Sequence, residues 1–233
     1  MPNLFQQLRP ILQRSTGLVP RTHILIFTPM IVLACATVIY FSLHSLLADN
    51  RVKASLTDRF IKKSWYRLVY NVVAIGGLGL IGYLFLITEK QAVAPALLDS
   101  AIADLVGILM GLSGVFIGLA AFSNYDTAEF LGLQQLRNSE ENTASLNTSG
   151  WNSIVRHPLY LATLLVLWGW FLLSPYDTVL LLAVFGSIYL YFGARLEEHK
   201  LIETFGNDYR EYQKQVPMLI PRFTKWKKKT EKK

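Results

Sequence analysis

Long apolar runs separated by short polar segments dominate this chain. Five runs have the composition of membrane helices: residues 24–47, 68–87, 101–122, 159–174 and 178–194. About 20 apolar residues cross a bilayer without tilt, so the last two runs are short for a span. The turn-forming residues Ser174, Pro175, Tyr176 and Asp177 lie between them, and we interpret the pair as a helical hairpin.

Two residues indicate where this hairpin begins and ends. Pro158 suits the first turn of a helix, where its missing N–H costs nothing. Gly206 is a typical helix C-terminal stop. The second hairpin helix is therefore predicted to continue through Glu197 and Leu201, beyond its apolar run.

Glycines gather in the second and third runs. They are Gly76, Gly77, Gly79 and Gly82 in the second, and Gly107, Gly111, Gly114 and Gly118 in the third. Small residues let membrane helices approach closely, so we interpret these glycines as packing residues.

The composition agrees with an all-α integral membrane protein of about five transmembrane helices with a cytoplasmic C-terminal helical segment. Hydrophobic residues make up 52% of the 233 residues and charged residues 17%. The net charge of +7 raises the alternative of nucleic-acid binding. The basic residues flank the apolar runs, which favours a lipid bilayer as the partner, with no nucleic acid. The single cysteine, Cys35, allows neither an internal disulfide nor a cysteine metal site.

The basic residues also predict the orientation. With five spans, four of the 23 lysines and arginines lie on one side: Arg9, Arg14, Arg21 and Lys90. The others lie on the opposite side, which the positive-inside rule assigns to the cytoplasm. The N-terminus is therefore predicted outside and the C-terminus in the cytoplasm, in what we take to be a bacterial cytoplasmic membrane.

Polar residues of possible chemical use stand at both ends of the hairpin. Arg156, His157 and Tyr160 lie at a helix N-terminus, where free N–H groups and the helix dipole favour an anion. An ordinary interface anchor with an aromatic residue explains them as well.

The other end of the hairpin carries acidic residues. Glu197 and Glu198 are costly at the end of an apolar helix unless they are paired or bind a ligand. Arg195 is three residues before Glu198 and is expected to pair with it. A solvated helix exit is the alternative. The cluster with His199 lacks the ligand spacing of a metal site, so no metal is predicted.

A histidine inside the first run is a third candidate. His44 lies near the predicted cytoplasmic end of this run, and an ionisable group inside a membrane is a functional hypothesis by default. A histidine hydrogen-bonded near the interface is the alternative.

Several motifs together resemble a known family. They are Arg156-His157-Pro158-Leu159-Tyr160, Glu197-Glu198-His199-Lys200-Leu201, Phe205-Gly206-Asn207-Asp208-Tyr209-Arg210-Glu211-Tyr212 and Val216-Pro217-Met218-Leu219-Ile220-Pro221. This pattern resembles the isoprenylcysteine carboxyl methyltransferase and phospholipid methyltransferase superfamily over about the last third of the chain. Upstream, Leu43-His44-Ser45-Leu46-Leu47-Ala48 and Phe130-Leu131-Gly132-Leu133-Gln134-Gln135 look like its bacterial branch with methanethiol S-methyltransferase and NnrU-like proteins.

The resemblance implies an integral membrane enzyme that uses S-adenosylmethionine. It implies a cytoplasm-facing cofactor pocket closed by the C-terminal segment, with a lipophilic acceptor entering from the membrane. Carried onto this chain, the pocket residues are Gln135, Arg156, His157, Tyr160, Glu197 and Glu198. Tyr209 and Tyr212 offer aromatic faces to the adenine or the sulfonium.

The expected organisation follows from these assignments. It consists of an N-terminal non-cytoplasmic segment (1–23), a three-helix membrane region (24–122), a cytoplasmic connecting loop (123–149), a cofactor-binding methyltransferase-like region with the hairpin (150–221) and a basic tail (222–233).

Methyl transfer requires alignment of the acceptor and the methyl group in a dry pocket. A carboxylate acceptor needs no base, whereas a thiol needs help to ionise. His44 is the predicted catalytic base for a small or lipophilic thiol. The alternatives are a haem-linked isomerase or reductase of the NnrU-like type, and a non-catalytic membrane assembly factor.

Overall fold

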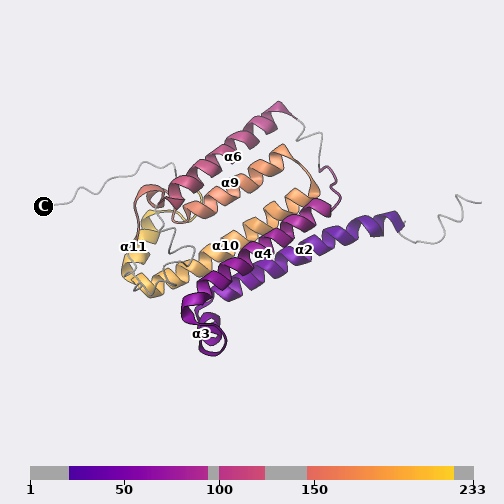
Figure 1. Cartoon of the computed structure of the whole chain (residues 1–233). Helices are drawn as coiled ribbons and strands as arrows, with labels where there is room; N and C mark the ends of the chain where they lie inside the picture. Colours follow the sequence, from indigo (N-terminus) through magenta and orange to yellow (C-terminus); the bar gives the residue numbers. More distant parts are fainter. Residues whose placement is uncertain (1–20, 94–99, 124–145, 223–233) are drawn as a thin grey trace, which may run out of the picture.

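The computed structural model describes residues 21–93, 100–123 and 146–222, and this part of the chain is built from helices (Figure 1). In these residues, β-type pairing is limited to an isolated antiparallel bridge between Ala92 and Tyr176. The predicted all-α class is confirmed.

Five apolar helices form the body of the protein. They are α2 (Arg21–Ala48), α4 (Lys63–Ile87), α6 (Ala101–Phe122), α9 (Pro158–Leu173) and α10 (Asp177–Phe205). In the described part of the chain four of them, all but α9, are long and apolar enough to cross a membrane. Helix α9 has 16 residues, fewer than the about 20 of an untilted span. The chain is an integral membrane protein.

The predicted hairpin boundaries are confirmed. Pro158 stands in the first turn of α9. Helix α10 runs 29 residues, past its apolar part, and ends at Gly206. Gly206 has φ 57°, a left-handed conformation that glycine adopts without a Cβ penalty.

Short helices lie at one end of the bundle. Helix α3 (Asn50–Arg59) follows α2, and helix α11 (Asn207–Gln215) follows α10. The 3₁₀ helix η1 (Gly150–Ser153) precedes α9. Figure 1 shows α3 and α11 at the same end of the long helices. The polar residues before α9 and at the end of α10 therefore meet at this end.

Backbone hydrogen bonds join two loops at the opposite end of the helix bundle. The N–H of Val93 donates to the carbonyl of Pro175 at 2.7 Å, and the N–H of Asp177 donates to the carbonyl of Gln91 at 2.9 Å. These bonds join the segment after α4 to the α9–α10 turn. The hairpin is thereby fixed to the first helices at the end away from its polar residues.

Glycine spacing explains the closest helix contact, between α6 and α9, which lie side by side in Figure 1. A Cβ on Gly114 would lie 2.7 Å from the carbonyl oxygen of Ala162, and one on Gly107 would lie 3.0 Å from that of Gly169. The packing interpretation is confirmed for these two glycines. It is confirmed as well for Gly77, where a Cβ would overlap the Tyr40 ring, and the backbone nitrogen of Gly111 would lie 2.9 Å from a Cβ on Gly169. It is wrong, among the described residues, for Gly76, Gly79 and Gly82, where a Cβ would meet nothing within 4 Å.

Candidate functional site

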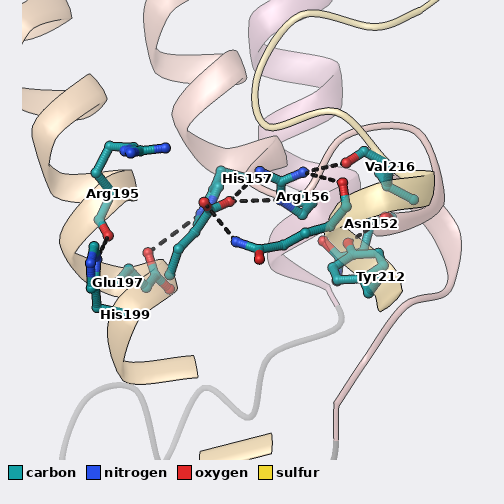
Figure 2. Close-up of polar contacts among 10 residues, drawn as sticks. Asn152, Arg156, His157, Arg195, Glu197, His199, Tyr212 and Val216 are labelled. Atoms are coloured by element: carbon teal, nitrogen blue, oxygen red, sulfur yellow. Dashed lines mark hydrogen bonds and ion pairs between the residues drawn. The ribbon is translucent and has the colours of Figure 1, made fainter. Parts of the chain in front are cut away.

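A buried ion pair joins the start of α9 to the end of α10. The Nε and Nη2 atoms of Arg156 donate to Oε1 of Glu198 at 2.6 and 2.5 Å (Figure 2). The side chains are 9% and 4% exposed, so the two charges neutralise each other away from water. Glu198 was expected to pair with Arg195, and this is wrong, because its carboxylate faces Arg156 in the segment that precedes α9.

His157 lies between the two carboxylates of α10. Its Nδ1 is 3.5 Å from Oε2 of Glu197, and its Nε2 is 3.4 Å from Oε1 of Glu198. Burial alone would lower the pKa of His157, but the hydrogen bonds and charges of the two carboxylates outweigh it and raise that pKa. The imidazole stacks on the ring of Tyr160, with centroids 5.3 Å apart.

The C-terminal segment closes over this cluster. The backbone N–H groups of Arg156 and His157 donate to the carbonyls of Pro217 and Met218 at 2.9 and 3.1 Å. The Nη1 atom of Arg156 donates to the carbonyl oxygens of Gln213 and Val216. The residues after α11 are therefore attached directly to the first residues of the α9 motif.

Gln213 was not identified from the sequence. Its Nε2 donates to Oε2 of Glu198 at 3.0 Å, on the oxygen that Arg156 does not use. Both carboxylate oxygens of Glu198 are thus occupied. The residue lies one turn after Tyr209 on the same helix, a spacing that would have pointed toward the cluster.

Tyr209 and Tyr212 pack in the hydrophobic cluster beneath α11. With Val216 they form its buried core, against Leu146, Leu201, Ile202 and Phe205. The hydroxyl of Tyr212 donates to the carbonyl of Asn152 at 2.5 Å. The hydroxyl of Tyr209 is buried and has no hydrogen-bond partner in the part of the chain that the structure describes. Burial, followed by the charge of Glu198, raises its pKa. Their assignment to the cofactor stays a prediction.

The exposed side chains beside this cluster carry charges of both signs. The Glu197 side chain is 46% exposed beside buried His157. Arg195 and His199 are exposed on the same helix, and Nδ1 of His199 is hydrogen-bonded to the carbonyl of Arg195 at 2.8 Å. Figure 2 shows Arg195, Glu197 and His199 along α10. In the described residues no group of three His, Cys, Asp or Glu side chains is placed to hold a metal.

A second polar cluster lies inside the helix bundle, around His44. Its Nε2 is hydrogen-bonded to the hydroxyl of Tyr70 on α4 at 2.8 Å. The ring of Tyr189 on α10 meets the imidazole edge-on, with centroids 6.2 Å apart. Neither tyrosine was identified from the sequence, although both are polar rings inside predicted spans.

An apolar groove of about 430 Å³ lies beside this second cluster, between α2 and α10. Phe41, Ser45 and Tyr189 are among its lining residues. The Tyr189 ring stacks on Phe41 at 4.2 Å, and the Ser45 hydroxyl donates to the Tyr189 hydroxyl at 3.5 Å.

The structure therefore gathers the predicted residues into two groups. Seven meet at the end that carries α11: Arg156, His157, Tyr160, Glu197, Glu198, Tyr209 and Tyr212. His44 lies apart, within α2. Gln135 lies outside the residues that the structure describes. The side chain of Lys200 connects the two regions by donating to the carbonyl of Ala48 at 2.8 Å.

Fold and site define a class of protein: an all-helical integral membrane protein whose buried ion-pair cluster joins a helical hairpin to a C-terminal cap. The chain belongs to the DUF1295 family, described as proteins of unknown function, whose model matches residues 47–216.

Curated relatives are methyltransferases. The chain is 31% identical over 186 residues to methanethiol S-methyltransferase 1 of Bradyrhizobium diazoefficiens, covering 76% of this chain and 62% of that protein. It is 29% identical over 184 residues to methanethiol S-methyltransferase of Crocosphaera subtropica, covering 76% and 69%. It is 27% identical over 194 residues to protein-S-isoprenylcysteine O-methyltransferase of Xenopus laevis, covering 78% and 60%.

These relatives confirm the resemblance to the isoprenylcysteine carboxyl methyltransferase superfamily and to its bacterial methanethiol S-methyltransferase branch. The chain spans less than two thirds of the length of the Bradyrhizobium and Xenopus relatives. No solved structure matches the chain significantly.

Proposed function

We propose that this protein is a membrane methyltransferase that uses S-adenosylmethionine to methylate a small or lipophilic acceptor at the cytoplasmic membrane face. The acceptor is a thiol or a carboxylate, and the thiol is favoured here. The names of the relatives support methyl transfer, and two of them carry methanethiol in their names.

The observation that carries this proposal is the difference in exposure and in hydrogen-bond partners between two adjacent carboxylates. Glu198 is 4% exposed and saturated by Arg156 and Gln213. Glu197 is 46% exposed; it lies 3.5 Å from His157, and the Tyr160 side chain and the charge of Lys200 also act on it. Glu198 therefore holds the architecture, while Glu197 has room for a cationic group from outside.

This arrangement fits part of the cofactor. S-adenosylmethionine, when bound, supplies a methyl group activated on a sulfonium, and it also carries an amino group, a carboxylate and an adenine. The half-exposed Glu197 suits the amino group. The rings of His157 and Tyr160 stack on each other, and His157 contacts Glu197.

Arg156 has a different role in this proposal from the one the resemblance implies. Its guanidinium is 9% exposed and is occupied by Glu198, Gln213 and Val216. It fastens the C-terminal cap to the start of α9. It thereby holds the neighbouring His157 in place beside Glu197.

The acceptor side is the region of His44. Tyr189 beside His44 and Glu197 at the cofactor side both lie on α10, eight residues apart, which is about 12 Å of helix. An apolar groove adjoins this region, so a small thiol can partition into it from the bilayer. His44 then serves as the base that a thiol needs.

The end with α3 and α11 is assigned to the cytoplasm because the basic residues gather there. A membrane-impermeant maleimide tests this in a cysteine-free Cys35→Ser background. In right-side-out vesicles, Lys90→Cys is expected to be labelled and Glu203→Cys to be protected; the reverse pattern contradicts the assignment.

Product formation tests the activity itself. Purified full-length protein in detergent is incubated with S-adenosylmethionine and methanethiol, and dimethyl sulfide and S-adenosylhomocysteine are measured. Both products are expected in equal amounts, with a loss of about 100-fold or more in His44→Gln and none in the exposed His199→Gln. Failure to methylate any thiol or carboxylate, or a Soret band in the purified protein, would overturn the proposal.

A further inference from the structure

Three helices meet at the imidazole of His44. Tyr40 precedes it by one turn on α2, Tyr70 faces it from α4, and Tyr189 faces it from α10. These three phenols are the titratable groups around the ring in the described residues. Arg67, one turn before Tyr70, is the charged side chain that acts on Tyr70. A polar cluster of this kind inside an apolar bundle requires an explanation beyond packing.

The two ring nitrogens of His44 differ in their hydrogen bonding. Nε2 is 2.8 Å from the Tyr70 hydroxyl. Nδ1 is buried and has no hydrogen-bond partner among the described residues. Leaving a buried polar atom unpaired costs about 1–3 kcal/mol. The unpaired nitrogen is therefore the one available for a ligand.

The partner of one ring nitrogen decides which nitrogen carries the proton. If Nε2–H donates to the Tyr70 oxygen, Nδ1 keeps its lone pair and can accept a proton. The same hydrogen bond then steadies the imidazolium once Nδ1 is protonated. Tyr70 would thus act on the reaction through His44, as the orienting member of a base–orienter pair.

We propose that Tyr70 is a positioning residue that holds His44 with its proton on Nε2, so that Nδ1 takes the proton of a thiol acceptor. This inference rests on the proposed function. The S–H bond breaks, its proton goes to Nδ1, and its electron pair stays on sulfur. That sulfur then accepts the methyl group that S-adenosylmethionine supplies, the sulfonium becomes a neutral thioether, and the imidazolium returns its proton to water.

The surroundings fit a thiol. Phe41 and Ser45, which flank His44 on α2, line the apolar groove together with Tyr189. A thiol is a weak hydrogen-bonding group and loses little on leaving water for such a groove. A carboxylate acceptor would bring a charge into the same apolar space at much higher cost.

The test compares Tyr70→Phe with Tyr83→Phe, the same change on the same helix at a lipid-facing position that is 59% exposed. Both full-length variants are assayed with S-adenosylmethionine and methanethiol across a pH series. Tyr70→Phe is expected to bind S-adenosylmethionine like wild type and to lower kcat about tenfold near neutral pH. The defect should shrink at high pH, where the thiol ionises without a base.

A second readout needs no cofactor. In protein with ¹⁵N-labelled histidine, the His44 resonances, assigned with His44→Gln, should show a protonated Nε2 and an unprotonated Nδ1. Tyr70→Phe should shift the Nε2 resonance, and Tyr83→Phe should not. Neutral His44 with its proton on Nδ1 would overturn the inference.

The kinetic outcomes separate the two proposals. A wild type that binds no S-adenosylmethionine overturns the proposed function and this inference with it. A wild type that binds and turns over, with Tyr70→Phe equal to Tyr83→Phe, overturns the role of Tyr70 alone. A Tyr70→Phe defect of the same size at every pH also overturns it, since it would show a structural effect on the bundle.

Discussion

Arg156 and Glu198 form a buried ion pair between the first residues of α9 and the end of α10, with Nε and Nη2 at 2.6 and 2.5 Å from one carboxylate oxygen. Because Arg156 also donates to the carbonyls of Gln213 and Val216 at the C-terminal end of α11, this pair fixes three segments at once. The geometry makes Glu198 a structural residue, and under the proposed function the half-exposed neighbour Glu197 binds the cofactor.

Removing one partner of this pair should destabilise the cap. In Glu198→Gln the guanidinium of Arg156 stays buried without its counter-charge, which typically costs about 3–5 kcal/mol. We expect a lower Tm in detergent and faster proteolysis after α11. Glu203→Gln, an exposed position on the same helix, is the control. Equal Tm values for the two variants would show that the pair does not hold the cap.

The two tyrosines of α11 should differ in stability when their hydroxyls are removed. Tyr212→Phe loses the hydrogen bond to Asn152, worth about 0.5–1.5 kcal/mol. Tyr209→Phe removes a buried hydroxyl that has no partner, so it should be neutral or stabilising. Urea unfolding of both variants measures the difference. A larger loss for Tyr209→Phe than for Tyr212→Phe would mean that the Tyr209 hydroxyl has a partner.

Stability should fall as pH rises through the titration of His157. Burial opposes the charge of this imidazole, but Glu197 and Glu198 raise its pKa above the ordinary value of about 6.5. A raised pKa in the folded state stabilises it fully below the ordinary value, and this contribution is lost as pH passes the raised value. The Tm of wild type should therefore decrease over that range more than that of His157→Gln. Parallel pH curves would contradict the ion-pair geometry.

Two glycines of α6 should respond in opposite ways to alanine. Gly114→Ala places a Cβ 2.7 Å from the Ala162 carbonyl and should lower stability by about 1–3 kcal/mol. Gly111→Ala meets nothing within 4 Å and should be neutral or stabilising, by up to about 1 kcal/mol. Thermal unfolding in one detergent gives both values. A stable Gly114→Ala would show that α6 and α9 are farther apart than described.

The helices were predictable because their signals are local. Apolar runs, Pro158 and Gly206 each act over a few residues, and the structure confirms the boundaries they indicated. The meeting of the two polar clusters also followed, since the two helices of a hairpin return the chain to the same side.

Side-chain partners were less predictable. Arg195 is near Glu198 in sequence, yet Glu198 pairs with Arg156, which precedes α9. The spacing of residues along the chain does not tell how close Arg156 and Glu198 lie in the folded protein. Tyr70 and Gln213 were missed for the same reason. Each lies on a different helix from its partner, and its contact exists only after the helices pack.

S-adenosylmethionine binding to Glu197→Gln and Glu203→Gln, by calorimetry on full-length protein in detergent, tests the central claim most directly. The variants make the same change on the same helix, six residues apart, and both side chains are exposed. The account predicts that Glu203→Gln binds like wild type and that Glu197→Gln binds about 10- to 100-fold more weakly, because a charged hydrogen bond is lost. Equal binding by the two variants, or no binding by wild type, would contradict it.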